Sequence, residues 1–109
     1  MRKTVVVSAK RTPIGSFGGV FKNVSAVELG VAVLKAIIAE TNLKVEQIDE
    51  VILGNVCGAG HGQNIARQVA IKSGVPDHIP AYTVNKVCGS GMKSVALGAL
   101  VIGTGEADI

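Results

Sequence analysis

The chain has 109 residues, of which 48% are hydrophobic and 17% are charged, and its formal net charge at pH 7 is +3. This length fits one domain with a modest core, and the apolar content excludes a disordered or fibrous protein. The basic residues are scattered and aromatic residues make up only 3% of the chain, which excludes nucleic acid as a partner.

The amino-terminal stretch MRKTVVVSAKRTP holds only three consecutive strongly apolar residues. A signal sequence or a membrane span needs a longer run, so we expect neither, and no membrane partner. The segment from Thr4 to Ala9 predicts a strand buried on both faces of a parallel sheet. A cytoplasmic, thiol-reducing location is the expected setting for such a chain.

The first predicted helix follows a loop that contains Pro13 and three glycines. Ser25 and Glu28 have the spacing of a capping box, and we expect the helix to end near Asn42. Its apolar positions recur at helical spacing: Leu29, Ala32, Val33, Ala36 and Ile37.

Two further strand and helix pairs follow. Glu50 to Val56 and Ala81 to Val87 have the composition of strands, and each is followed by a glycine-containing turn. The second helix is expected to bury Ile65, Ala66, Val69 and Ala70, and to stop at Gly74 and Pro76. The third helix is expected to use one apolar face made of Met92, Val95, Ala96, Ala99 and Leu100, and to end at Gly103 and Gly105.

The predicted order β-α-β-α-β-α indicates an α/β protein, with a parallel sheet, right-handed crossovers and helices packed on its faces. The last residues, GEADI, look like the approach to a fourth strand. We therefore expect the chain to be the amino-terminal piece of a longer protein.

A metal site is not expected. Cys57 and Cys88 cannot complete a four-ligand site, and they are too far apart for a Cys-x-x-Cys pair. His61 lies four residues after Cys57, but no further ligands are spaced around them. Cys57, His61 and His78 are interpreted as structural or solvated residues.

The stretch VNKVCGSGMKSVALGAL raises the question of phosphate binding, because GSGMKS superficially resembles a P-loop. In a P-loop the lysine directly follows the last glycine, whereas here Met92 precedes Lys93, and Lys86 occupies the place of the first glycine. The dinucleotide pattern Gly-x-Gly-x-x-Gly also fails, because Ser94 replaces the third glycine. We expect no cofactor-binding residues.

Cys88 is the candidate nucleophile of the same stretch. It falls at the carboxyl end of a predicted strand and at the amino end of a helix, where open α/β sheets place their ligands. The free amides and the dipole of the helix favour a thiolate, and they could stabilise an oxyanion during acyl transfer. Gly89 and Gly91 would let a substrate approach closely. The alternative is that Cys88 is a small buried hydrophobe.

The segment VNKVCGSGMKSV resembles the active-site segment of the thiolases, and RTPIGSFGG, GNV and GQNIARQVAIKSGVP extend the likeness over the whole chain in the same order. The resemblance implies that residues 1–109 are the amino-terminal part of the thiolase N-terminal domain, truncated before its fourth strand. It implies a five-layered thiolase-type fold and a homo-oligomer, dimer or tetramer. It also places Arg67 and Gln68 near a subunit interface, with a solvated helix face as the alternative.

The resemblance further implies an acetyl-CoA acetyltransferase that condenses two acetyl-CoA molecules to acetoacetyl-CoA, with Cys88 as the acetylated residue. Coenzyme A thioester is then the substrate, and no separate cofactor is required. In the family, a histidine of a Gly-His-Pro segment, an asparagine of an Asn-Glu-Ala-Phe segment and a second cysteine of a Cys-x-Gly segment complete the site. These later segments do not occur here, so the 109 residues alone are not expected to turn over.

Three alternatives stay open. A degradative 3-ketoacyl-CoA thiolase shares the same cysteine turn, and a condensing enzyme of fatty-acid synthesis also places a cysteine between a strand and a helix. The third alternative is a non-catalytic fragment that pairs with a complementary piece, because an open sheet edge accepts a partner strand.

Overall fold

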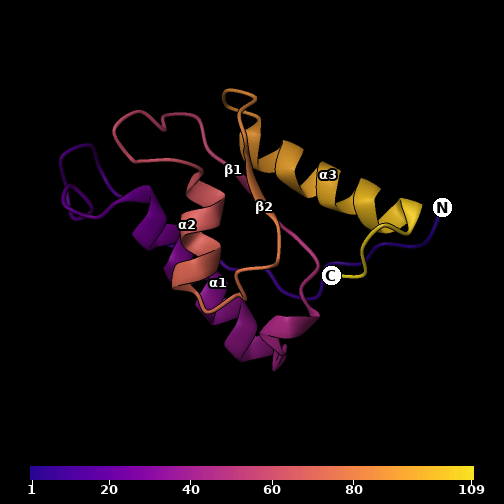
Figure 1. Cartoon of the computed structure of the whole chain (residues 1–109). Coiled ribbons are helices and arrows are strands. Elements are labelled where there is room, and N and C mark those ends of the chain that lie inside the picture. Colours follow the sequence, from indigo (N-terminus) through magenta and orange to yellow (C-terminus); the bar gives the residue numbers. More distant parts are fainter.

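The structure is a computed structural model that describes residues 1–109. Its sheet consists of two parallel strands, β1 (Val51–Gly54) and β2 (Ala81–Val84). Helices α1 (Ala26–Thr41) and α2 (Ile65–Lys72) lie on one side of the sheet and α3 (Ser90–Thr104) lies on the other (Figure 1). A short 3-10 helix (Val45–Gln47) joins α1 to β1. These layers confirm the α/β class and the parallel sheet.

The ends of α1 are set by residues close to them in the sequence. The Ser25 side chain accepts a hydrogen bond from the Glu28 N–H at 3.1 Å, and the Glu28 carboxylate accepts one from the Ser25 N–H at 2.7 Å. Asn42 ends the helix with a left-handed backbone, φ 52°. The predicted capping box and helix end are both confirmed.

The core lies between α2, α1 and the sheet. All four residues predicted to face inward from α2 are buried: Ile65, Ala66, Val69 and Ala70. Val69 packs with Val27 of α1, whereas Ala70 packs with Ile48, Val75 and Ile79. The amphipathic spacing of α2 therefore identified the centre of the core.

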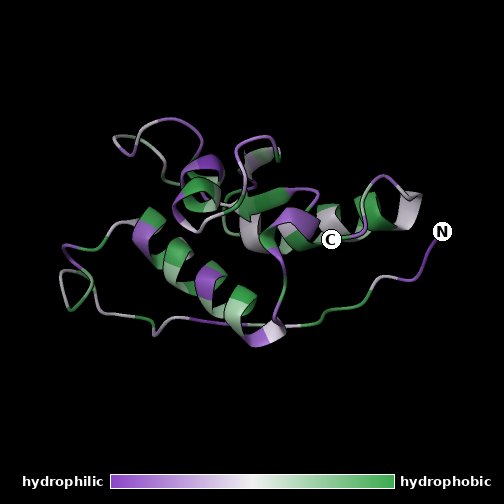
Figure 2. Ribbon diagram, turned by 60° about the horizontal axis from the view of Figure 1, so that its bottom comes forward, coloured by the Kyte–Doolittle hydropathy of each residue, from purple (hydrophilic) through white to green (hydrophobic).

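The predicted strand at Thr4–Ala9 is wrong for this structure. The segment is extended and unpaired, and Val5, Val6 and Val7 are 63%, 77% and 79% exposed. An apolar groove of about 340 Å³ is lined mainly by residues of α1 and β1, together with Thr12 and Val69. Figure 2 marks the hydrophobic residues of α1 and of the sheet in green. A strand forms only when its backbone groups find partners, and no neighbouring strand here pairs with this segment.

The predicted face of α3 is also wrong. Met92, Val95 and Leu100 are 82%, 66% and 50% exposed, whereas Ser90 and Gly103 are buried. The helix is apolar around most of its circumference, so periodicity could not select the side that meets the sheet. Gly54 of β1 lets the start of the helix approach the sheet closely at Ser90, whereas Gly103 lies against Met1.

Residues 87–104 have a mean hydropathy of 1.4 and are long and apolar enough to cross a membrane by length and composition. A single helix of this kind is weak evidence for a membrane span, because the core helix of a soluble protein has the same length and composition. In this structure α3 contacts both strands of the sheet.

The last residues do not form the predicted fourth strand, but they are tied to the start of β1. The Asp49 carboxylate accepts hydrogen bonds from the N–H groups of Asp108 at 2.7 Å and Ile109 at 3.1 Å. These two donors, with a smaller contribution from Arg2, hold the pKa of the Asp49 carboxyl below its ordinary value of 3.8.

This carboxylate predicts an acid-sensitive attachment of the carboxyl-terminal residues. Its stabilising contribution is complete above the ordinary pKa and is lost as the pH falls through the lower folded pKa. In an NMR titration, the carboxyl carbon signal of Asp49 should shift with a midpoint below 3.8. Asp49→Asn should abolish that transition, and a midpoint above 3.8 would contradict the assignment.

Candidate active site

Cys88 lies in the turn between β2 and α3. Gly54 pairs with Val84, so the carboxyl ends of both strands meet at one edge, and the turn extends from that edge (Figure 1). The Cys88 thiol is free and exposed, which excludes the alternative of a buried structural cysteine. Cys88 lines none of the cavities of the molecule and is presented on the surface.

The turn is closed by Ser90, which is 4% exposed. The Ser90 hydroxyl donates to the Val87 carbonyl at 2.6 Å and accepts from the Lys86 N–H at 2.9 Å. The Gly89 N–H also donates to the Lys86 carbonyl, at 3.0 Å. The backbone on both sides of Cys88 is therefore held by short-range hydrogen bonds.

Val87 has a strained backbone conformation. Its φ is +46°, in the left-handed region, which is a genuine outlier for a β-branched residue. Such a residue costs on the order of 1–3 kcal/mol and persists only when its surroundings hold it in place. The strain lies directly before the candidate nucleophile.

Three amide groups around the turn are left without an acceptor in the chain: those of Cys88, Gly91 and Met92. The first amides of a helix have no intrahelical partner. In α3 the first helical hydrogen bond is donated by the Lys93 N–H to the Gly89 carbonyl, at 2.9 Å. Free N–H donors beside a thiol can stabilise the negative charge that develops on a carbonyl oxygen under attack.

Gly54 sets the close contact between β1 and the start of α3. A Cβ at this position would lie 2.3 Å from the Ser90 carbonyl carbon and 2.5 Å from the Gly91 nitrogen. Only glycine allows the helix to begin at this distance from the strand. Sequence reasoning did not identify Gly54 or Ser90 as site residues, because their contact joins segments that are distant in the chain.

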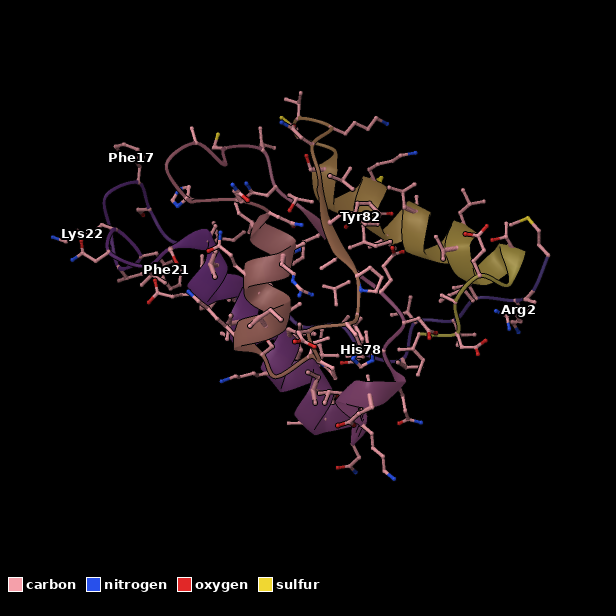
Figure 3. All side chains as sticks on the ribbon, in the orientation of Figure 1. Arg2, Phe17, Phe21, Lys22, His78 and Tyr82 are labelled. Carbon is pink, nitrogen blue, oxygen red and sulfur yellow. The ribbon has the colours of Figure 1, made fainter.

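Cys57, His61 and His78 are not gathered into a metal-binding cluster. Cys57 is exposed in the loop after β1, and the carbonyl of His61 accepts a hydrogen bond from Gln68. His78 precedes β2 and lies at the end of the sheet away from the turn (Figure 3). No group of three or more His, Cys, Asp or Glu side chains is placed to hold a metal ion, and the Cys88 thiol bonds no side chain.

Arg67 is engaged within the chain. Its guanidinium donates to the carbonyls of Ile79 at 3.0 Å and Asp77 at 2.6 Å, and its backbone N–H donates to the side chain of Asn64. These bonds fix the loop that leads into β2. The Arg67 side chain is bonded within the chain, so the alternative expectation of a solvated helix face is wrong for Arg67 in this structure.

Comparison with known proteins extends over nearly the whole chain. Residues 4–109 match the thiolase N-terminal domain. The chain is 56% identical to a probable acetyl-CoA acyltransferase of Staphylococcus aureus strain COL and 55% identical to that of strain MRSA252, in each case over all 109 residues. The chain spans 28% of the length of these relatives.

A solved structure shows the same fold. The crystal structure of Acat5 thiolase from Ascaris suum in complex with coenzyme A superposes with a TM-score of 0.84 and 47% sequence identity. The match covers 86% of this chain and 25% of that one. The match to residues 4–109, together with this superposition, shows that the chain belongs to the thiolase family.

Proposed function

We propose that the chain carries the nucleophile of an acetyl-CoA acetyltransferase, which condenses two acetyl-CoA molecules to acetoacetyl-CoA through an acetyl-Cys88 intermediate. The observation that carries the proposal is the exposed Cys88 at the start of α3, with its own N–H free. The relatives described above support the acyltransferase class, and the coenzyme A in the Ascaris suum structure supports the kind of substrate.

In the first half of the reaction, the Cys88 thiolate attacks the carbonyl carbon of acetyl-CoA. A sulfur–carbon bond forms, and the carbonyl electrons move onto oxygen, where free backbone N–H groups can stabilise them. The electrons on oxygen then re-form the carbonyl as the bond to the coenzyme A sulfur breaks, and the leaving thiolate takes a proton from water. Dividing the transfer into two steps in this way is the general advantage of a covalent intermediate.

The second half needs a base to remove a methyl proton from the second acetyl-CoA. The carbanion then attacks the acetyl carbon on Cys88, a carbon–carbon bond forms, and the bond to the Cys88 sulfur breaks, which returns the Cys88 thiolate. No side chain bonds the Cys88 thiol in this chain. We propose that residues 1–109 are the amino-terminal part of a thiolase N-terminal domain and that the remaining groups come from the rest of a thiolase subunit. On this proposal the complete enzyme is a homo-oligomer.

The test is acetyl transfer to the chain itself. After brief exposure to acetyl-CoA at neutral pH, peptide mass spectrometry should find one acetyl group on Cys88 and little on Cys57, which is also free and exposed. Equal labelling of both cysteines, or none, would contradict the proposal. Steady-state formation of acetoacetyl-CoA is not expected from the 109 residues.

A second candidate is a non-catalytic fragment that pairs with a complementary piece. The exposed apolar side chains of Met92, Val95 and Leu100 on α3 favour this candidate, since exposed apolar surfaces of this kind are typical of sites that bind another protein segment. Association on addition of the complementary piece, without selective acetylation of Cys88, would support this candidate over the first. Both candidates fit a cytoplasmic setting, which we propose because both thiols are free.

A further inference from the structure

The side chain of Asn85 bridges the cysteine turn to the loop that follows β1. Its Oδ1 accepts a hydrogen bond from the Val87 N–H at 3.0 Å, and its Nδ2 donates to the Val56 carbonyl at 3.4 Å. The Val87 N–H has no other partner. An asparagine that binds the N–H two residues later is a standard way of shaping a turn.

Together with Ser90, this contact holds the two peptide groups that flank Val87. Asn85 binds the N–H before the Val87 Cα, and the Ser90 hydroxyl and N–H bind the carbonyl after it, at 2.6 and 3.1 Å. Because both neighbouring peptide planes are held, the left-handed conformation of Val87 is held as well.

The orientation of the second of these planes decides the direction of the Cys88 amide. In a planar trans peptide, the carbonyl of one residue and the N–H of the next point in opposite directions. The Val87 carbonyl points to Ser90, so the Cys88 N–H points away from Ser90 and stays free of acceptors in the chain.

We propose that Asn85 is a positioning residue for acyl transfer: by holding Val87 in its left-handed conformation, it aims the Cys88 N–H at the oxyanion that forms on the thioester. This inference rests on the proposed function of Cys88. Asn85 does not touch the reacting atoms, and its contribution is transmitted through the backbone of Val87.

The experiment compares two reactions of the same thiol in the full 109-residue chain. Acetylation by acetyl-CoA passes through an oxyanion, whereas alkylation by iodoacetamide does not. Asn85→Ala should slow acetylation of Cys88 on the order of tenfold and leave its alkylation within about twofold. A merely structural role would slow or accelerate both reactions together and would overturn the proposal.

Two further variants test the route through Val87. Glycine adopts a positive φ without strain, so adding Val87→Gly to Asn85→Ala should restore most of the acetylation rate. Asn85→Asp keeps an acceptor for the Val87 N–H and should lose less than Asn85→Ala, and it serves as the test if the alanine variant does not fold. Failure of the glycine to restore the rate would overturn the proposed route.

Asn23→Ala is the matched control, because Asn23 is exposed and its side chain forms no hydrogen bond, and it should leave both rates unchanged. A parent chain that is never acetylated at Cys88 would contradict the proposed function itself. The positioning role would then be decided by the Cα and Cβ chemical shifts of Val87. They should leave the left-handed range in Asn85→Ala, and unchanged shifts would overturn the inference.

Discussion

Gly54→Ala is expected to destabilise the chain by about 3 kcal/mol or more, at or above the upper end of the usual cost of overpacking. The added methyl group would lie 2.3, 2.4 and 2.5 Å from backbone atoms of Ser90 and Gly91, which cannot rotate away as a flexible side chain can. Relief requires α3 to move off β1 and the cysteine turn to move with it. Urea or thermal unfolding followed by circular dichroism measures the effect.

Gly98→Ala is the matched control for this change, because it introduces the same methyl group into the middle of α3. A Cβ at Gly98 meets nothing within 4 Å. Since alanine is favoured over glycine inside a helix by roughly 0.5–1 kcal/mol, this variant should be as stable as the parent or slightly more stable. Equal stabilities for Gly54→Ala and the parent would show that the strand and helix do not pack as described.

The second large effect is expected at the nucleophile. Cys88→Ser should abolish acetyl-thioester formation, because an unactivated hydroxyl is a far weaker nucleophile than a thiol. The Cys88 side chain has no hydrogen-bonded base that could activate a serine in its place. The measurement is incorporation of radiolabelled acetyl groups that hydroxylamine removes.

Cys57→Ser provides the comparison, since Cys57 is also free and exposed but lies in a loop several residues before the next helix, whereas Cys88 lies directly before the start of α3. This variant should be acetylated at the parental rate. Loss of labelling in Cys57→Ser, or labelling retained in Cys88→Ser, would show that the acetyl group is not carried by Cys88. Either result would remove the basis of the proposed function.

The prediction of α3 shows where sequence periodicity stops being informative. Met92, Val95 and Leu100 have helical spacing, yet they face solvent in this structure. The helix meets the sheet instead through its other side, where Ser90 is buried and Gly54 allows a close approach. When apolar residues surround a helix, the contact is chosen by the shape of both partners, and spacing along one of them carries no such information.

The sequence by itself determined the features that depend on neighbouring residues. The bonds that cap α1 at Ser25 join residues three positions apart, and the inward face of α2 follows from helical periodicity alone. The position of Cys88 in a turn between a strand and a helix was also predictable, because strand and helix composition is read from neighbouring residues.

Only the tertiary structure decided which segments pair, which side of α3 is covered and how the turn is held. Thr4–Ala9 has a strand-like sequence but remains unpaired, and the contacts of Gly54 and Asn85 join parts of the chain that lie far apart in sequence. The physical reason is that strand pairing and close packing depend on partners distant in sequence, whereas caps, helical faces and turns are satisfied within a few residues.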